Sequence, residues 1–431
     1  MTMRLLYRLF ALTVFLLMGY VAVTLLAAVK FLNDDPLALS LPYHLVNGFA
    51  NVLLDLTLLT GLIAGGLYAI VKERTTLAVA AERALIILVN SWFALVLLAS
   101  VGGALGILEG RLLLELPPLL DVVLIVLCGG FIVVAVLNVE RWTAIPLVWC
   151  AGMCIALLCT AAAFFPPADP FNAMRFDALL TGLRLQVGYL LAGLALMFWL
   201  MHRFSNITPA WMQMGVYNLG GMLALAGVLN TIVPLVMIEN TSLPPLLQLF
   251  TVIYVPLVFI NLAAHSYRAL SDRNSSQMLA AHWVAFAVIL LLLAGGLMGM
   301  LNTLGDLNRW TQGTRLTDLR LTLMALALVA VLLGVINQSG AEIREENRRI
   351  TGLIPFWLVS FGVIGGSVAL FGAGIVQVYM ERIMGVGYLE TQTAMIPLYG
   401  FWVVGWLIVA LGMITYILGF WARRPMMSVR E

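Results

Sequence analysis

TRLTDLRLTLMALALVAVLLGVIN, residues 314–337, is the stretch that decides the fold class of this chain. Beyond Arg320 it contains no charged residue, and Leu, Ala, Val, Met and Ile make up most of it. Its 24 residues exceed the roughly 20 that an α-helix needs to cross a ~30 Å hydrocarbon core. The stretch therefore predicts a membrane-spanning helix that carries an arginine more than one turn inside its mouth.

Apolar runs of this kind recur along the whole chain. Of its 431 residues, 62% are hydrophobic and only 10% are charged, which excludes an ordinary soluble globular protein. The links between the runs are short, so we predict an all-α polytopic membrane protein with twelve transmembrane helices, forming a single domain over residues 1–431. The predicted spans are 5–30, 44–71, 83–107, 117–138, 144–165, 183–203, 208–237, 244–267, 279–303, 314–337, 353–380 and 394–421.

The placement of charge predicts how the chain lies in the membrane. If the N-terminus faces the cytoplasm, 15 of the 23 Lys and Arg residues fall on the cytoplasmic side and 8 on the other side. Because cytoplasmic loops carry the excess of Lys and Arg, we expect both termini in the cytoplasm. The apolar run behind Arg4 and Arg8 is too long for a signal peptide and is interpreted as the first helix. A net charge of +2 indicates no nucleic-acid partner, whereas membrane lipids are expected neighbours.

Side chains that bind metals are scarce. No two of the four histidines are three or four residues apart, the spacing that places side chains on one helix face. Cys150 and Cys154 have that spacing, but all four cysteines fall inside apolar runs and are interpreted as packing residues. We therefore predict no metal site. The residues concerned are His44, His202, His265, His282, Cys128, Cys150, Cys154 and Cys159.

Ionisable residues within the spans are a stronger functional signal, because a charge in lipid is costly and normally faces the bundle interior with a partner. Asp55, Asp121, Arg184, Asp318 and Arg320 belong to this class. Asp318 and Arg320 are two residues apart, so they point to different faces of their helix. Arg320 is therefore expected either to find a partner on another helix or to extend its long side chain to the membrane surface.

Four stretches carry a resemblance to a known family. They are GGLYAIVKER (65–74), LMFWLMHR (196–203), TSLPPLLQLFTVIYVPLVFINLAAHSY (241–267) and LTDLRLTLMAL (316–326). They resemble parts of the second, sixth, eighth and tenth helices of subunit I of the heme–copper oxidase superfamily, in particular its C-type oxidase and nitric-oxide reductase branches. The resemblance implies a twelve-helix bundle of the subunit I type, located in a bacterial inner membrane.

In that family six histidines hold two hemes and a copper or non-heme iron. The resemblance implies that helices two and ten face each other across the low-spin heme, while helices six, seven and ten hold the active-site heme and the second metal. Every equivalent position in this chain lacks histidine. These positions are Asn51 with Phe49 on helix two, Gly182 on helix six, Val236 and Met237 on helix seven, and Arg320 and Thr322 on helix ten.

The missing imidazoles lead us to expect no oxygen or nitric-oxide reduction of the family type, because Val, Gly and Thr cannot bind iron or copper as histidine does. No cofactor is predicted. A low-spin heme held in a shifted way, by His44 with Met237, remains an alternative. In place of the heme we predict a buried pair in which Arg320 faces Asp55 and Asn51, which lie four residues apart on one helix face.

Three functions follow. The first is a non-catalytic subunit I-like protein, a pseudoenzyme with a structural, assembly or regulatory role, whose partners are other respiratory-complex subunits or a c-type cytochrome. The second is a transporter or channel in which Asp55, Asp121 and Arg320 line a substrate path. The third is an active terminal oxidase or nitric-oxide reductase with rearranged ligands. The absent histidines favour the first, and the sequence leaves open whether lipid, quinone or heme fills the vestigial pocket.

Overall fold

The computed structural model describes residues 2–32, 43–72, 79–105, 118–139, 143–237, 245–273, 278–304, 307, 310–311, 313–343 and 353–422. Apart from one isolated bridge between Ser205 and Arg273, these residues form no β-structure. The helical elements are α1 (Thr2–Leu32), α2 (Tyr43–Val71), α3 (Val79–Ala104), α4 (Pro118–Leu137), α5 (Ala144–Ala162), α6 (Pro170–Leu183), η2 (Arg184–Tyr189), α7 (Leu190–Phe204), α8 (Pro209–Met237), α9 (Pro245–Ser271), α10 (Met278–Leu291), η4 (Leu292–Met298), α11 (Gly299–Thr303), α13 (Arg315–Ile343), α14 (Leu353–Gln377), η5 (Val378–Ile383) and α15 (Tyr388–Ala422).

Twelve segments of the described chain are helical, long and apolar enough to cross a membrane. They confirm the predicted all-α polytopic membrane fold, because each matches one predicted span in order. Three spans are not uniform α-helices. The sixth combines α6, η2 and α7, the ninth combines α10, η4 and α11, and the eleventh combines α14 and η5, with a π-helix in each.

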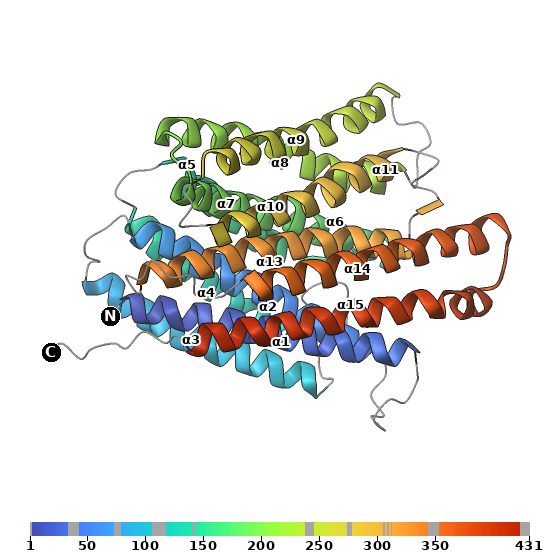
Figure 1. Cartoon of the computed structure of the whole chain (residues 1–431), viewed down its shortest axis with the longest axis horizontal. Coiled ribbons are helices and arrows are strands. Elements are labelled where there is room, and N and C mark those ends of the chain that lie inside the picture. Colours follow the sequence, from blue (N-terminus) through green and yellow to red (C-terminus); the bar gives the residue numbers. More distant parts are fainter. Residues whose placement is uncertain are drawn as a thin grey trace.

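α2, α13 and the sixth span form the centre of the bundle. In their most apolar windows 100% of the α2 residues are buried, 94% of those in the sixth span and 89% of those in α13, against 28% in α9 and 33% in α3. α13 packs against both α2 and α7, while α9 and α3 run along opposite edges (Figure 1). Asp55, Arg184 and Arg320 lie on these three spans and are each less than 10% exposed, so they are surrounded by protein and not by lipid.

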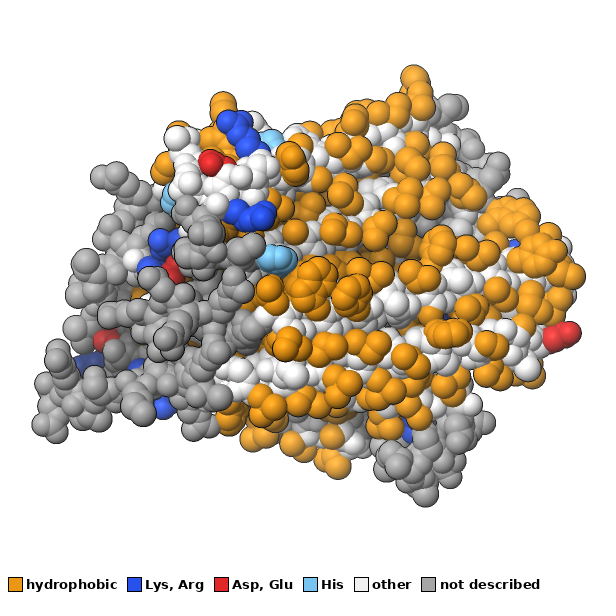
Figure 2. All heavy atoms as spheres, viewed as in Figure 1, with side chains coloured by type: hydrophobic (Ala, Val, Ile, Leu, Met, Phe, Trp, Pro, Cys, Tyr) orange, Lys and Arg blue, Asp and Glu red, His pale blue; other side chains and the backbone are white. Residues whose placement is uncertain are grey.

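The outer surface is apolar between the two ends of the bundle. Figure 2 shows hydrophobic side chains across most of this face, with the coloured charged side chains near the ends. Large apolar side chains project outward, including Phe15 (69% exposed), Leu158 (68%) and Phe401 (67%). An apolar surface of this extent is typical of a protein that contacts lipid along its length.

α14 and α15 approach each other closely because glycines line their contact. A Cβ atom on Gly405 would lie 2.7 Å from the backbone nitrogen of Gly366, and a Cβ atom on Gly362 would lie 2.7 Å from the carbonyl oxygen of Gly405. In lipid the hydrophobic effect does not drive helices together, so close backbone contact at small residues is a main source of association. The last two spans are thus held together as a pair.

Candidate functional site at the polar centre of the bundle

A buried ion pair joins α2 to the sixth span. Arg184 Nη2 donates a hydrogen bond to Asp55 Oδ2 at 3.2 Å, and the Asp55 side chain is 0% exposed. Arg184 Nη1 also donates to Thr160 Oγ1 at 3.5 Å. Asp121, in the first turn of α4, is close enough for its charge to act on Arg184. Of the ionisable residues singled out from the sequence, Asp55 and Arg184 therefore form a buried pair, and the half-buried Asp121 acts on it.

The predicted pair of Asp55 with Arg320 is wrong. Arg320 Nη2 donates instead to Gln186 Oε1 at 2.9 Å and to the backbone oxygen of Asn230 at 3.4 Å. Arg320 is only 4% exposed, so its side chain does not extend to the membrane surface. It finds its partners on other helices, but they are neutral, and Asp55 is paired with Arg184.

A π-helix at the centre of the sixth span carries the side chains that contact Asp55 and Arg320. η2 carries Arg184 and Gln186, and all six of its residues are buried. π segments occur as short bulges inside α-helices, frequently at functional sites. Here Arg184 meets Asp55 on α2 while Gln186 meets Arg320 on α13. Sequence analysis missed Gln186, because hydrophobic periodicity contains no signal for a π-helix.

Two adjoining cavities lie between α2, α13, α14 and α15. Their volumes are about 190 and 100 Å³, and Asn51 and Thr322 line both. These are two of the positions that the resemblance equates with heme ligands, so the structure brings them to one site. The complete set of shared lining residues is Asn47, Asn51, Leu319, Thr322, Leu370 and Trp402.

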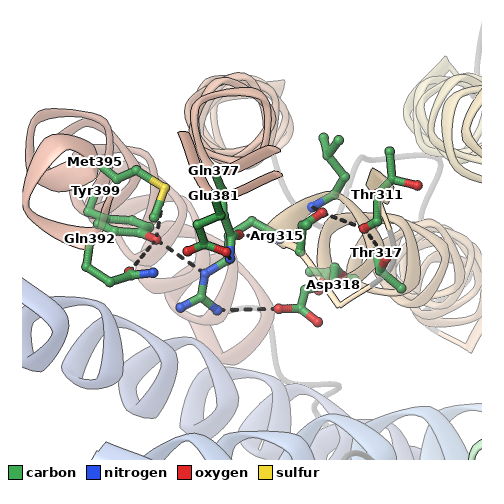
Figure 3. A network of polar contacts seen from close by, with 12 residues as sticks. Thr311, Arg315, Thr317, Asp318, Gln377, Glu381, Gln392, Met395 and Tyr399 are labelled. Carbon is green, nitrogen blue, oxygen red and sulfur yellow. Dashed lines mark hydrogen bonds and ion pairs between the residues drawn. The ribbon is translucent and has the colours of Figure 1, made fainter. Parts of the chain in front are cut away.

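Arg315, which lines the larger cavity, is the centre of a network of polar contacts (Figure 3). Its Nε donates to Tyr399 Oη at 3.3 Å, and its Nη1 donates to Asp318 Oδ2 at 3.3 Å. Its backbone nitrogen donates to Gln377 Oε1 at 3.1 Å, and Tyr399 Oη donates to Gln392 Oε1 at 3.2 Å. The charges of Arg315 and Asp318 therefore offset each other, and side chains from α13, α14 and α15 form a connected polar rim.

The remaining positions from the resemblance are placed differently. Gly182 lies against α8, where a Cβ atom on it would be 2.5 Å from Thr231 Cγ2. Val236 and Met237 end α8, and their side chains, like that of His44, lie outside the described part of the chain. The alternative of a heme held by His44 and Met237 therefore stays a prediction.

The residues around the two cavities do not fit a heme. Asn51 and Thr322 present an amide and a hydroxyl, which are not the axial ligands that proteins use for heme iron. Volumes of about 190 and 100 Å³ are also below the roughly 300–1,000 Å³ of typical cofactor sites. Elsewhere, no three His, Cys, Asp or Glu side chains in the described residues come close enough to hold a metal ion. His265, for example, stacks on Trp211 with ring centroids 4.9 Å apart.

A second polar cluster, which sequence analysis missed, surrounds Glu342 at the end of α13. Tyr68 Oη and Gln338 Nε2 each donate to its carboxylate at 2.9 Å, and Lys72 forms an ion pair with it. Arg203 Nε lies 3.6 Å from Glu342 Oε1. Burial alone would raise the pKa of Glu342, but the bonds from Gln338 and Lys72 and the nearby positive charges outweigh it, so the pKa lies below its ordinary value.

No known protein-family model matches this chain. Its functional interpretation therefore depends on the residues themselves and on the geometry of the two polar regions on either side of α13.

Proposed function

We propose that this protein is a non-catalytic relative of heme–copper oxidase subunit I and serves as a structural, assembly or regulatory subunit of a respiratory complex in a bacterial inner membrane. The proposal rests on the contacts made on the two sides of α13. Thr322 shares a cavity with Asn51 of α2, whereas Arg320 meets Gln186 of the sixth span and Asn230 of α8. The resemblance likewise implies one site between helices two and ten and another among helices six, seven and ten, although it places Arg320 opposite helix two.

The side chains at these places suit a scaffold better than a redox centre. Arg320 is hydrogen-bonded to two neutral oxygens from other helices, and Arg184 ties the sixth span to α2 through Asp55. Contacts of this kind hold helices together but supply no imidazole or thiolate for a transition metal. A protein with this interior can keep the shape of a subunit I while leaving electron transfer to its partners.

The first test is a reduced-minus-oxidised absorbance spectrum of the purified full-length protein in mild detergent, combined with heme extraction and metal analysis. We expect no heme bands and no stoichiometric iron or copper. Heme at one per chain would overturn the non-catalytic assignment and favour an enzyme with rearranged ligands. His44→Ala would then show whether that residue is the ligand.

The partner role needs a separate measurement. The tagged protein is purified from its native membranes after mild cross-linking, and the recovered chains are identified by mass spectrometry. We expect c-type cytochromes or other respiratory subunits in a fixed ratio, and we expect deletion of the gene to lower the amount of the assembled complex. Recovery of the chain alone, with unchanged respiratory complexes in the deletion strain, would contradict a subunit role.

Transport is the second candidate, and one observation favours it. Asp55 keeps a buried oxygen, Oδ1, without a hydrogen-bond partner among the described residues, while its other oxygen is paired with Arg184. Buried ionisable residues of this kind mark ion and proton pathways in many transporters. Proton and sodium flux into proteoliposomes tests this function. Flux that is abolished by Asp55→Asn and retained in Asp318→Asn would favour transport over the subunit role.

A further inference from the structure

The larger cavity has the features of a ligand site, independently of any relationship to oxidases. Its volume is about 190 Å³, and it adjoins the cavity of about 100 Å³. Asn47 and Asn51, one helical turn apart on α2, both line it, and neither amide has a hydrogen-bond partner in the described structure. Asn47 is exposed and Asn51 is half-buried, so both amides can be reached by a molecule that enters the cavity and forms hydrogen bonds with them.

The charges around the cavity favour a neutral ligand. Arg315 and Asp318, which both line the cavity, are paired with each other at 3.3 Å, and Arg315 is further held by Tyr399 (Figure 3). Because these two charges already offset each other, they give a charged ligand no net electrostatic attraction. The ligand is therefore expected to interact through hydrogen bonds and apolar contact.

The walls favour a flat ring that carries a hydroxyl group. Trp402 lines both cavities, Tyr43 and Tyr399 line the larger one, and Leu319 and Leu370 complete an apolar wall. Aromatic side chains prefer stacked or edge-on contact with another ring. Each asparagine amide offers a donor and an acceptor, and a hydroxyl group complements both.

We propose that this cavity binds a neutral hydroxylated aromatic ring, with Asn51 and Asn47 as its hydrogen-bonding partners and Trp402 as its ring contact. Two sources supply this chemistry, namely a small phenol that enters the cavity and the ring of a membrane quinol. The proposal does not depend on the proposed subunit role, because it uses only the lining residues of the cavity.

The test uses 4-fluorophenol, which is neutral at pH 7 as a tyrosine side chain is, and the protein in lipid nanodiscs. Fluorine-19 NMR is expected to show a saturable bound signal for 4-fluorophenol and none for 4-fluorotoluene, which lacks the hydroxyl. Asn51→Leu should weaken binding about tenfold, as the loss of one buried hydrogen bond implies. Asn90→Leu, at an exposed position on α3, should leave it unchanged.

Equal binding by both probes, or unchanged binding in Asn51→Leu, would overturn the proposal. If Asn51→Leu does not fold, Asn47→Leu gives the same test at the second proposed hydrogen-bonding partner, one helical turn away on α2. A competition experiment identifies the source of the ring. Displacement of 4-fluorophenol by a long-tailed quinol at equal or lower concentration assigns the site to a membrane quinol, and displacement by short phenols alone assigns it to a free phenol.

Discussion

Asp55 is the residue at which the cost of a buried charge is most evident. It is 0% exposed and its counter-ion is Arg184, whose side chain is 8% exposed. Removing one member of such a pair leaves the other as an uncompensated charge, whereas replacing both with apolar residues is often tolerated. The contribution of this pair to the free energy of unfolding is therefore measured by single and double substitutions, because the distance between the two side chains does not give it.

The ion pair leads to the first prediction. Arg184→Leu should destabilise the protein by roughly 3–5 kcal/mol, and the double variant Asp55→Leu/Arg184→Leu should recover most of that loss. Fluorescence-detected size-exclusion chromatography after heating measures both. The matched control is Asp55→Leu/Arg320→Leu, which should show no recovery because those two side chains do not pair. Recovery in the control alone would restore the pairing expected from the sequence.

Glu342 leads to a prediction about pH. Its pKa in the folded protein is below the ordinary value of 4.5, because hydrogen bonds and positive charges around it outweigh the effect of burial. A lowered carboxyl pKa stabilises the folded state above the unfolded pKa, and this stabilisation is lost as the pH falls through the folded pKa. Glu342→Gln should therefore lower the melting temperature at pH 7, and the difference from wild type should shrink below about pH 4.5. A constant difference across that range would show that the carboxylate charge is not responsible.

At the scale of elements, the close contact between α14 and α15 depends on glycine residues, which have no side chain. A Cβ atom at Gly405 would meet the backbone of Gly366 at 2.7 Å, and backbone atoms cannot move aside as a flexible side chain can. Gly405→Ala should therefore cost about 1–3 kcal/mol through overpacking, measured as a lower melting temperature in detergent. Gly400→Ala on the same helix is the control, because no atom lies within 4 Å of its Cβ position. Similar losses in both variants would indicate an effect of helix propensity or lipid contact.

Helix interruptions are the part of the element structure that the sequence did not predict. Spans six, nine and eleven were each predicted as one continuous helix, and each contains a π segment. A π turn changes the direction of a few side chains without changing the apolar composition of the span, so hydropathy cannot detect it. In the sixth span the π segment η2 carries Arg184 and Gln186, the two residues that contact Asp55 and Arg320.

For the whole molecule, the path of the chain predicts which end of the bundle faces the cytoplasm. α1 begins and α15 ends at the same end of the bundle (Figure 1), and the bias of Lys and Arg predicts that this end is cytoplasmic. A fluorescent protein that folds only in the cytoplasm should therefore fluoresce when it is fused to the C-terminus. Alkaline phosphatase, which is active only outside the cytoplasm, should be active when it is inserted at Gly385, in the link between the last two spans. The reverse pattern of reporters would contradict the predicted orientation.

The sequence by itself determined the all-α class, the twelve spans and the identity of the costly intramembrane residues, because burial in lipid acts on composition and length, which a linear chain displays directly. Only the tertiary structure decided that Asp55 pairs with Arg184 and that Arg320 rests on Gln186 and Asn230. Which side chains pair depends on how each helix is rotated about its axis and on the position of a π turn. Neither can be predicted from the order of the residues.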